Sequence, residues 1–291
     1  MFALEEDVPI ESGMLSSSLD SAQKKVETYY YDIRKSLFDY DQVLNIQRVK
    51  VYKDRRTALF SAEDELVRTM EGYAAGTVDD IVYANIDPSV PSSEWDLEAI
   101  VGKFVQYCYV LDPTTAENDA DKALREEFDV DVSVEDVAKL VASAQSGSRD
   151  PVAAAEAAID AMRDYFAQKT VAAYRYKRKF VENVEEGLME QAERFFVLTQ
   201  TDNLWKRHLE AMRFIQQAVG LRGYAQRDPL TEYKLEGYEL FQEMQAQVRR
   251  NVIYSVYQFK AKRIQPEQIA AAEAEAAEAE QPEKEKVANN K

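Results

Sequence analysis

Two segments of this chain repeat their apolar residues at three- and four-residue steps, which is the spacing of one face of a helix. The first stripe holds Trp205, Leu209, Met212, Ile215 and Val219, and the second holds Tyr233, Gly237, Leu240, Met244 and Val248. A break at Gly220 and Gly223 separates them. Asp228 is a typical N-cap, and Pro229 suits a first helical position because its missing N–H has no partner there. The pattern predicts a helical hairpin.

The tip of this predicted hairpin holds Arg222, Gly223 and Tyr224. An aromatic ring at the end of a stiff hairpin is poorly placed for core packing and well placed to contact another molecule. The alternative is an ordinary antiparallel helix pair whose tip is simply solvated. Gly237 lies on the apolar stripe, where it costs about 1 kcal/mol relative to Ala, so it indicates a close approach of two helices.

A much longer helix is predicted near the N-terminus, because no Gly or Pro lies between Gly13 and Gly72. We expect it to run from about residue 19 to 73. Its apolar seam has a near-heptad rhythm with Gln47 as the polar break, and comprises Val26, Tyr30, Ile33, Leu37, Tyr40, Leu44 and Val51. A seam this long needs partners along its whole length. Taken alone, it also fits a coiled-coil dimer.

The structure of the rest of the chain is predicted from its helix-breaking residues and its composition. Prolines make residues 77–151 a region of shorter helices, with Trp95 expected to anchor a small core with Phe104, Tyr107 and Tyr109. Residues 152–199 are predicted to be helical and to lead into the hairpin at 200–263. The acidic, alanine-rich residues 264–291 are predicted to be a disordered tail.

Charge is distributed unevenly along the 291 residues, whose formal net charge is −17. Residues 79–161 carry 19 acids and 5 bases, whereas residues 190–263 carry 12 bases and 9 acids. The mildly basic hairpin, with Arg213, Arg222 and Arg227, could meet an acidic protein surface or anionic lipid. The basic segment YRYKRKF at 174–180 spreads around a helix axis, so we expect it to pair with acids of this chain and expect no nucleic-acid binding.

Several classes of site are not expected. The single Cys108 cannot form an internal disulfide, and no apolar run approaches the roughly 20 residues that span a bilayer. The N-terminal residues do not read as a signal peptide. The single His208 has no second histidine nearby, so we expect a partly buried, hydrogen-bonded side chain rather than a metal ligand. The acidic run 119–136 lacks the glycine and spacing of a calcium loop. We predict no catalytic, metal or cofactor site.

Two blocks of this sequence resemble SecA, the ATP-driven motor of bacterial and plastid protein export. The first holds LWKRHLEAM, LRGYAQRDP and EYKLEGYELF and is similar to the family's two-helix finger. The second, residues 5–48, is similar to the start of its helical scaffold. The amino-acid sequence of both blocks is most similar to the cyanobacterial and plastid branch of the family. The resemblance implies an all-α fold, with residues 1–76 as first part of the scaffold, 77–151 as helical wing and 152–199 as return helix.

The resemblance also implies a function. In the family, ATP-driven motion passes through the scaffold helix to the finger, which enters the SecY channel, and Tyr224 would contact the moving preprotein. The family's nucleotide-binding domains precede the matching blocks, and no two glycines here have the GxxxxGK[ST] spacing, so we expect no ATP or Mg²⁺ site in this chain and no ATPase activity alone. Motor domains on a separate chain would be partners. The family's zinc module has no counterpart in the tail.

These implications predict a protein of the cytoplasm or plastid stroma that associates peripherally with the membrane. If the motor domains are absent, part of the seam on the long helix should be left bare. The alternative is a stand-alone coiled-coil or scaffolding protein without a transport role. The sequence leaves open whether the chain is a natural fragment, one part of a split gene or an excised piece.

Overall fold

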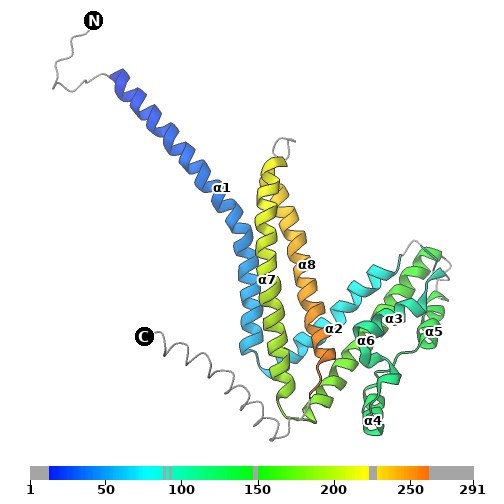
Figure 1. Cartoon of the computed structure of the whole chain (residues 1–291). Helices are drawn as coiled ribbons and strands as arrows, with labels where there is room; N and C mark the ends of the chain where they lie inside the picture. The colour runs from blue at the N-terminus through cyan, green and yellow to red at the C-terminus, as the bar shows by residue number, and fades with distance from the viewer. Residues whose placement is uncertain (1–12, 88–89, 92–93, 147–149, 223–227, 262–291) are drawn as a thin grey trace, which may run out of the picture. The chain divides into compact units, whose positions relative to one another are not determined.

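The computed structural model describes residues 13–87, 90–91, 94–146, 150–222 and 228–261, apart from the side chains of Pro151, Leu221 and Arg222. Within these ranges the protein is built from helices and contains no β-strand (Figure 1). The prediction of an all-α fold is confirmed. The α-helices are α1 (Gly13–Phe60), α2 (Glu63–Asn85), α3 (Leu97–Tyr107), α4 (Asp119–Phe128), α5 (Val134–Gln145), α6 (Pro151–Glu182), α7 (Leu188–Arg222) and α8 (Pro229–Gln258), with short 3-10 turns η2 (Tyr109–Leu111) and η3 (Pro113–Thr115).

The predicted continuous helix from residue 19 to 73 is wrong, because the helix is broken at Ser61 and Ala62. Ala62 is extended, with φ −62° and ψ 158°, and acids fill the first turn of α2, where they favour a helix N-terminus. Arg194 donates a hydrogen bond of 2.8 Å to the carbonyl of Ser61. Neither Gly nor Pro marks this break, which explains why the pattern of the sequence missed it.

The predicted helix from 152 to 199 is also interrupted. α6 ends at Glu182, and α7 begins only at Leu188. Between them Gly187 has φ +76°, a left-handed conformation that glycine adopts at little cost. The Glu182 carboxylate accepts a hydrogen bond of 2.9 Å from the N–H of Gly187. The hairpin's first arm is therefore part of a 35-residue helix that starts at this turn.

The described residues fall into two compact units. Unit 1 contains α1 and the parts of the hairpin arms between residues 201 and 245, and unit 2 contains residues 61–200 together with the chain from 246 onward. In unit 1, the C-terminal part of α1 lies along the paired arms α7 and α8, while its N-terminal part extends away from them (Figure 1). Its core is Met212, Val219 and Tyr233, against which pack the half-buried Tyr40, Val43, Leu44, Ile215 and Leu240. Burying each core side chain contributes about 1.5–3 kcal/mol.

Unit 2 is organised around α6, which packs against α2, α4 and α5. Phe166 of α6 stacks on Phe104 of α3, with ring centroids 3.8 Å apart. Trp95 is half-buried and donates a hydrogen bond of 3.1 Å to the carbonyl of Val90. Arg125 is almost fully buried, and its guanidinium donates to the carbonyls of Val110 and Asp112 at 2.5 and 2.6 Å and to Asp131 at 2.9 Å. One side chain thus fastens the irregular segment between α3 and α5.

Candidate interaction site

The apolar stripes of the hairpin face the core of unit 1, as the sequence predicts. In α7, Trp205, Met212 and Val219 are buried, while Leu209 lies at the margin with 37% of its surface exposed. The stripe of α8 is buried at Tyr233, Gly237 and Met244 and half-buried at Leu240. The two arms therefore form a packed pair whose outward faces remain available to another molecule.

The second arm starts where the sequence predicts. The Asp228 carboxylate accepts hydrogen bonds from the N–H groups of Leu230 and Thr231 at 3.4 and 3.1 Å, and from the hydroxyl of Thr231 at 2.5 Å. The Thr231 hydroxyl is the main reason why the pKa of this carboxyl lies below its usual range. Pro229 is the first helical residue. This cap fixes the point at which the chain returns toward the core.

The predicted contact residues at the tip lie mostly outside the described residues. Arg222 is the final residue of α7, so the helix continues through Gly220 and ends later than predicted, but its side chain is not described. Gly223, Tyr224 and Arg227 lie outside the described residues. Their role as polypeptide or channel contacts stays a prediction. Of the basic residues near the tip, Arg213 is described and is exposed.

The apolar seam of α1 is used over only part of its length. Toward its C-terminal end, Tyr40 and Leu44 are half-buried against the core of unit 1, and Val51 is buried. By contrast, every residue from 13 to 38 is exposed, including the seam residues Val26, Tyr30, Ile33 and Leu37. The prediction that part of the seam is bare is therefore confirmed. An exposed apolar face of this length is typical of a surface that another protein segment covers.

A groove of about 550 Å³ runs between α1 and α8 within unit 1. Its apolar lining comes from Val43, Ile46, Tyr238 and Phe241, of which Ile46 and Tyr238 are largely exposed. Charged side chains stand around it, namely Asp39, Lys50 and Lys234. An apolar floor with a charged border can accept a protein segment, and it offers no nucleophile with an adjacent base.

Polar contacts inside unit 1 tie α1 to both arms of the hairpin. Arg55 makes two hydrogen bonds with the Asp202 carboxylate, at 2.9 and 3.2 Å. Deeper in the unit, His208 lies 2.8 Å from Gln47, and Gln47 donates at 2.9 Å to the carbonyl of Gly237. Burial lowers the pKa of His208 to about 4, so it is neutral near pH 7. The predicted hydrogen bond of His208 is confirmed, and the side chain is almost fully buried where the sequence predicts partial burial.

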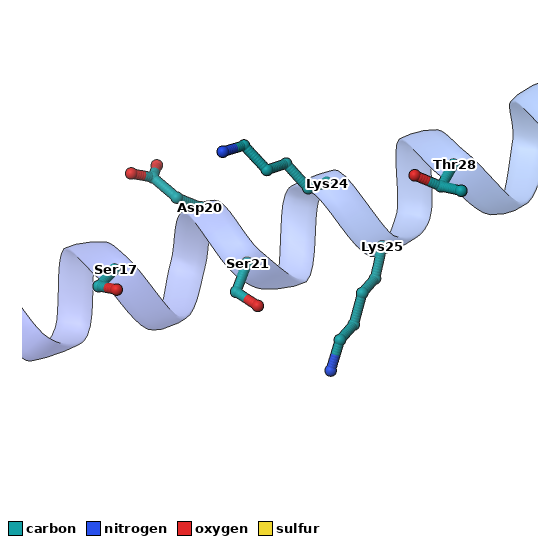
Figure 2. Close-up of a pocket in the computed structure, with 6 residues that line it drawn as sticks. All are labelled: Ser17, Asp20, Ser21, Lys24, Lys25 and Thr28. Carbon is teal, nitrogen blue, oxygen red and sulfur yellow. The ribbon is translucent and has the colours of Figure 1, made fainter.

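Another hollow in unit 1 offers no arrangement of side chains suited to catalysis or binding. A hollow near the N-terminus of α1 is lined by Ser17, Asp20, Ser21, Lys24, Lys25 and Thr28, but Figure 2 shows that all six come from one helix and that Lys24 and Lys25 point in opposite directions. In the described part of the chain, no group of three or more His, Cys, Asp or Glu side chains is arranged to hold a metal ion.

The basic segment 174–180 is paired within unit 2, as the sequence predicts. Arg175 bonds to Glu71 at 2.7 Å, and Arg178 bonds to the buried Glu193 at 3.0 Å. Lys177 is buried and donates to the hydroxyl of Tyr109, and burial lowers its pKa to about 8. Arg175 and Arg178 thus pair with acids of this chain, as predicted, and Lys177 contacts a tyrosine.

Comparison with known proteins identifies the family of this chain. The family model of the SecA Wing and Scaffold domain matches residues 9–260. This chain belongs to that family. It is 52% identical over 265 residues to the chloroplastic protein translocase subunit SecA of Ostreococcus lucimarinus, covering 91% of this chain and 25% of that protein. It is 48% identical over 263 residues to chloroplastic SECA1 of Arabidopsis thaliana, covering 90% and 22%.

A cyanobacterial relative gives the same picture. The protein translocase subunit SecA of Synechocystis sp. is 42% identical over 269 residues, which covers 92% of this chain and 25% of that protein. The similarity to the cyanobacterial and plastid types is thereby confirmed. The chain spans about a quarter of the length of these relatives. Among the described residues, no helix is both long and apolar enough to cross a membrane.

Proposed function

We propose that this chain provides the scaffold, wing and two-helix finger of a SecA-type protein translocase, and that it passes ATP-driven motion to a preprotein in the SecY channel. The observation that carries the proposal is the divided seam of α1. One part of the seam holds the hairpin, and the exposed part from Val26 to Leu37 offers a face to further protein. A helix that binds two bodies along one face is suited to transmit motion between them.

The energy source lies outside this chain in the proposal. The sequence has no phosphate loop of the GxxxxGK[ST] type, so ATP and Mg²⁺ would bind to motor domains joined to it or carried by a separate chain. The isolated chain is expected to hydrolyse no ATP. Measured turnover above that of a denatured sample would contradict this division of roles.

The proposed partner of the hairpin tip is the polypeptide in transit. An aromatic ring at Tyr224 can contact varied side chains and backbone without requiring one sequence. The proposed location is the cytoplasm or plastid stroma, with peripheral attachment at the channel and at anionic lipid. The exposed Arg213 and the net positive charge of residues 190–263 support an acidic or anionic partner.

A chimera tests the proposal. This chain would replace the matching quarter of the Synechocystis relative, and preprotein entry into vesicles that contain the channel would be measured. We expect the chimera to translocate, Tyr224→Ala to lose most of that activity with ATP binding unchanged, and Tyr224→Phe to retain it because the ring is kept. A well-folded chimera that hydrolyses ATP but moves no preprotein would overturn the proposal. Full activity of Tyr224→Ala would remove the role of the ring.

The second candidate is a helical scaffolding protein that pairs with itself. The same exposed seam favours it, because apolar residues at near-heptad spacing can form a coiled coil. Sedimentation equilibrium of the isolated chain distinguishes the two. A discrete dimer that becomes monomeric with Leu37→Asp would favour the scaffolding role. A monomer would favour burial of the exposed seam by other parts of a translocase.

A further inference from the structure

The apolar contacts of unit 1 do not by themselves define the register of the hairpin, which is its position along the axis of α1. Apolar packing has no preferred direction, and a seam with near-heptad spacing offers similar neighbours one helical turn away. A shift of one turn moves a helix by about 5.4 Å. A directional contact that acts on α1, α7 and α8 together would select one position.

Three groups at the centre of unit 1 meet these conditions, one from each helix. Gln47 of α1 and His208 of α7 are 6% and 3% exposed. Gln47 contacts α8 at Gly237, and His208 contacts it at Phe241. The Gln47 amide nitrogen donates to the Gly237 carbonyl at 2.9 Å, and the amide oxygen lies 2.8 Å from Nε2 of His208. A single amide thus bridges three helices in an otherwise apolar interior.

The hydrogen-bond roles in this cluster follow from its partners. A backbone carbonyl can only accept, so the Gln47 nitrogen must face Gly237 and its oxygen must face His208. His208 must then carry its proton on Nε2. Its Nδ1 is buried and has no hydrogen-bond partner within the described ranges, which disfavours a second proton on the ring. Trp205 stacks on the ring, and Phe241 meets it edge-on.

Gly237 makes this arrangement possible. A Cβ at position 237 would lie 2.7 Å from Cε of Met212, whose side chain would have to shift, and at a contact distance of 3.8 Å from Cγ1 of Val43, so glycine favours the close approach of α8 to α7. The carbonyl of a helix residue keeps a second lone pair beside its helical hydrogen bond. Gln47 uses it. The backbone of Gly237 is therefore both a point of contact and an acceptor.

We propose that Gln47, His208 and the Gly237 carbonyl form a register lock that holds the hairpin at one position along α1. A one-turn slide would set the Gln47 amide and the His208 N–H against apolar side chains, and buried polar groups without partners are strongly disfavoured. Buried polar residues in helical seams are known to select a register while adding little stability. The lock is a property of unit 1 and holds for either function proposed above.

The decisive variant removes both side-chain partners at once. Gln47→Leu with His208→Phe keeps the interior apolar and filled, so it should fold. In the full chain with Cys108→Ala, spin labels at exposed residues Lys53 of α1 and Glu239 of α8 would report their distance by pulsed electron paramagnetic resonance. The parent protein should give one narrow distribution. The double variant should give a broadened distribution or a second population displaced by up to about 5 Å.

The control and the second measurement make the test independent of how well the variant folds. Asn45→Leu adds an apolar residue at an exposed position of α1 and should leave the distribution narrow. In the unsubstituted protein, nitrogen NMR of the only histidine should show a proton on Nε2 and a bare Nδ1. The lock is overturned if the double variant keeps a single narrow distance equal to that of its parent, or if the proton resides on Nδ1.

Discussion

Gly237 of α8 lies so close to Met212 of α7 that a Cβ on the glycine would come within 2.7 Å of the methionine methyl group. Met212 is completely buried, so its side chain would have to shift within a packed interior to admit this Cβ. Overpacking of a filled interior costs about 1–3 kcal/mol, which equals or exceeds the gain of about 1 kcal/mol from replacing glycine by alanine in a helix. The contact explains why a glycine occupies the buried stripe.

Gly237→Ala is therefore expected to lower the free energy of unfolding by about 1 kcal/mol. Urea denaturation followed by circular dichroism measures it. Gly72→Ala is the matched control, because Gly72 is exposed in α2 and a Cβ there meets nothing within 4 Å. That variant should gain stability. Equal gains for the two variants would show that α7 and α8 are not in tight contact.

The Asp228 cap gives a local prediction. Asp228→Ala removes the acceptor for two backbone N–H groups at the start of α8, so amide hydrogens in the first turn of that helix should exchange faster with solvent. Asp228→Asn keeps a side-chain oxygen and should retain most of the protection. Hydrogen exchange read by mass spectrometry would detect the difference. Unchanged exchange in the alanine variant would count against the cap.

His208 makes stability depend on pH in a defined direction. Its pKa is about 4 in the folded protein, against an ordinary value near 6.5 that the unfolded chain is expected to have. Between these values the unfolded state binds more protons, so the histidine's contribution is fully present above pH 6.5 and is lost as the pH falls toward 4. The loss is on the order of 3 kcal/mol at pH 4.

The measurement compares unfolding free energies of the parent and of His208→Gln at several pH values. Glutamine does not titrate, so the difference between the two proteins should shrink from pH 7 to pH 4. Carboxyl groups titrate in both proteins and cancel in this difference. A difference that is constant over the window would mean that the ring is not held neutral by burial.

Unit 2 depends on a buried carboxylate. Glu193 is completely buried, accepts from the Tyr174 hydroxyl at 2.7 Å and pairs with Arg178 at 3.0 Å. Glu193→Leu leaves both partners without this acceptor and should destabilise unit 2 by about 3 kcal/mol. Glu190→Ala is the control, since that half-exposed residue forms an i,i+4 pair with Arg194 and should cost less than about 1 kcal/mol. Similar losses in the two variants would refute the distinction.

The two parts of the α1 seam should respond differently to the same substitution. Leu37 is 61% exposed, so Leu37→Asp should change the free energy of unfolding by less than about 0.5 kcal/mol. Leu44 packs against the core of unit 1, so Leu44→Asp should lower the melting temperature clearly. Thermal denaturation checks both. A large loss from Leu37→Asp in the isolated chain would mean that this part of the seam is already covered.

Much of this protein could be predicted from the sequence, because helix periodicity and capping are local properties. The stripes of the hairpin, the cap at Asp228 and the glycine approach at Gly237 all follow from the spacing and type of nearby residues. The family resemblance likewise depends on order along the chain. The ends of the long helices are harder to predict from the sequence. The break at Ser61 has no glycine or proline to mark it, and a single glycine at position 187 does not by itself predict a turn.

Only the tertiary structure decided which of these residues contact one another. Gln47 stood out as a polar break, His208 as a lone histidine and Gly237 as a costly glycine, yet nothing local indicates that residues up to 190 positions apart share one hydrogen-bonded cluster. The fold also decided how far the seam is used, with Leu44 covered and Leu37 bare. The physical reason is that periodicity determines which face of a helix is apolar, while the packing of distant segments determines what covers that face.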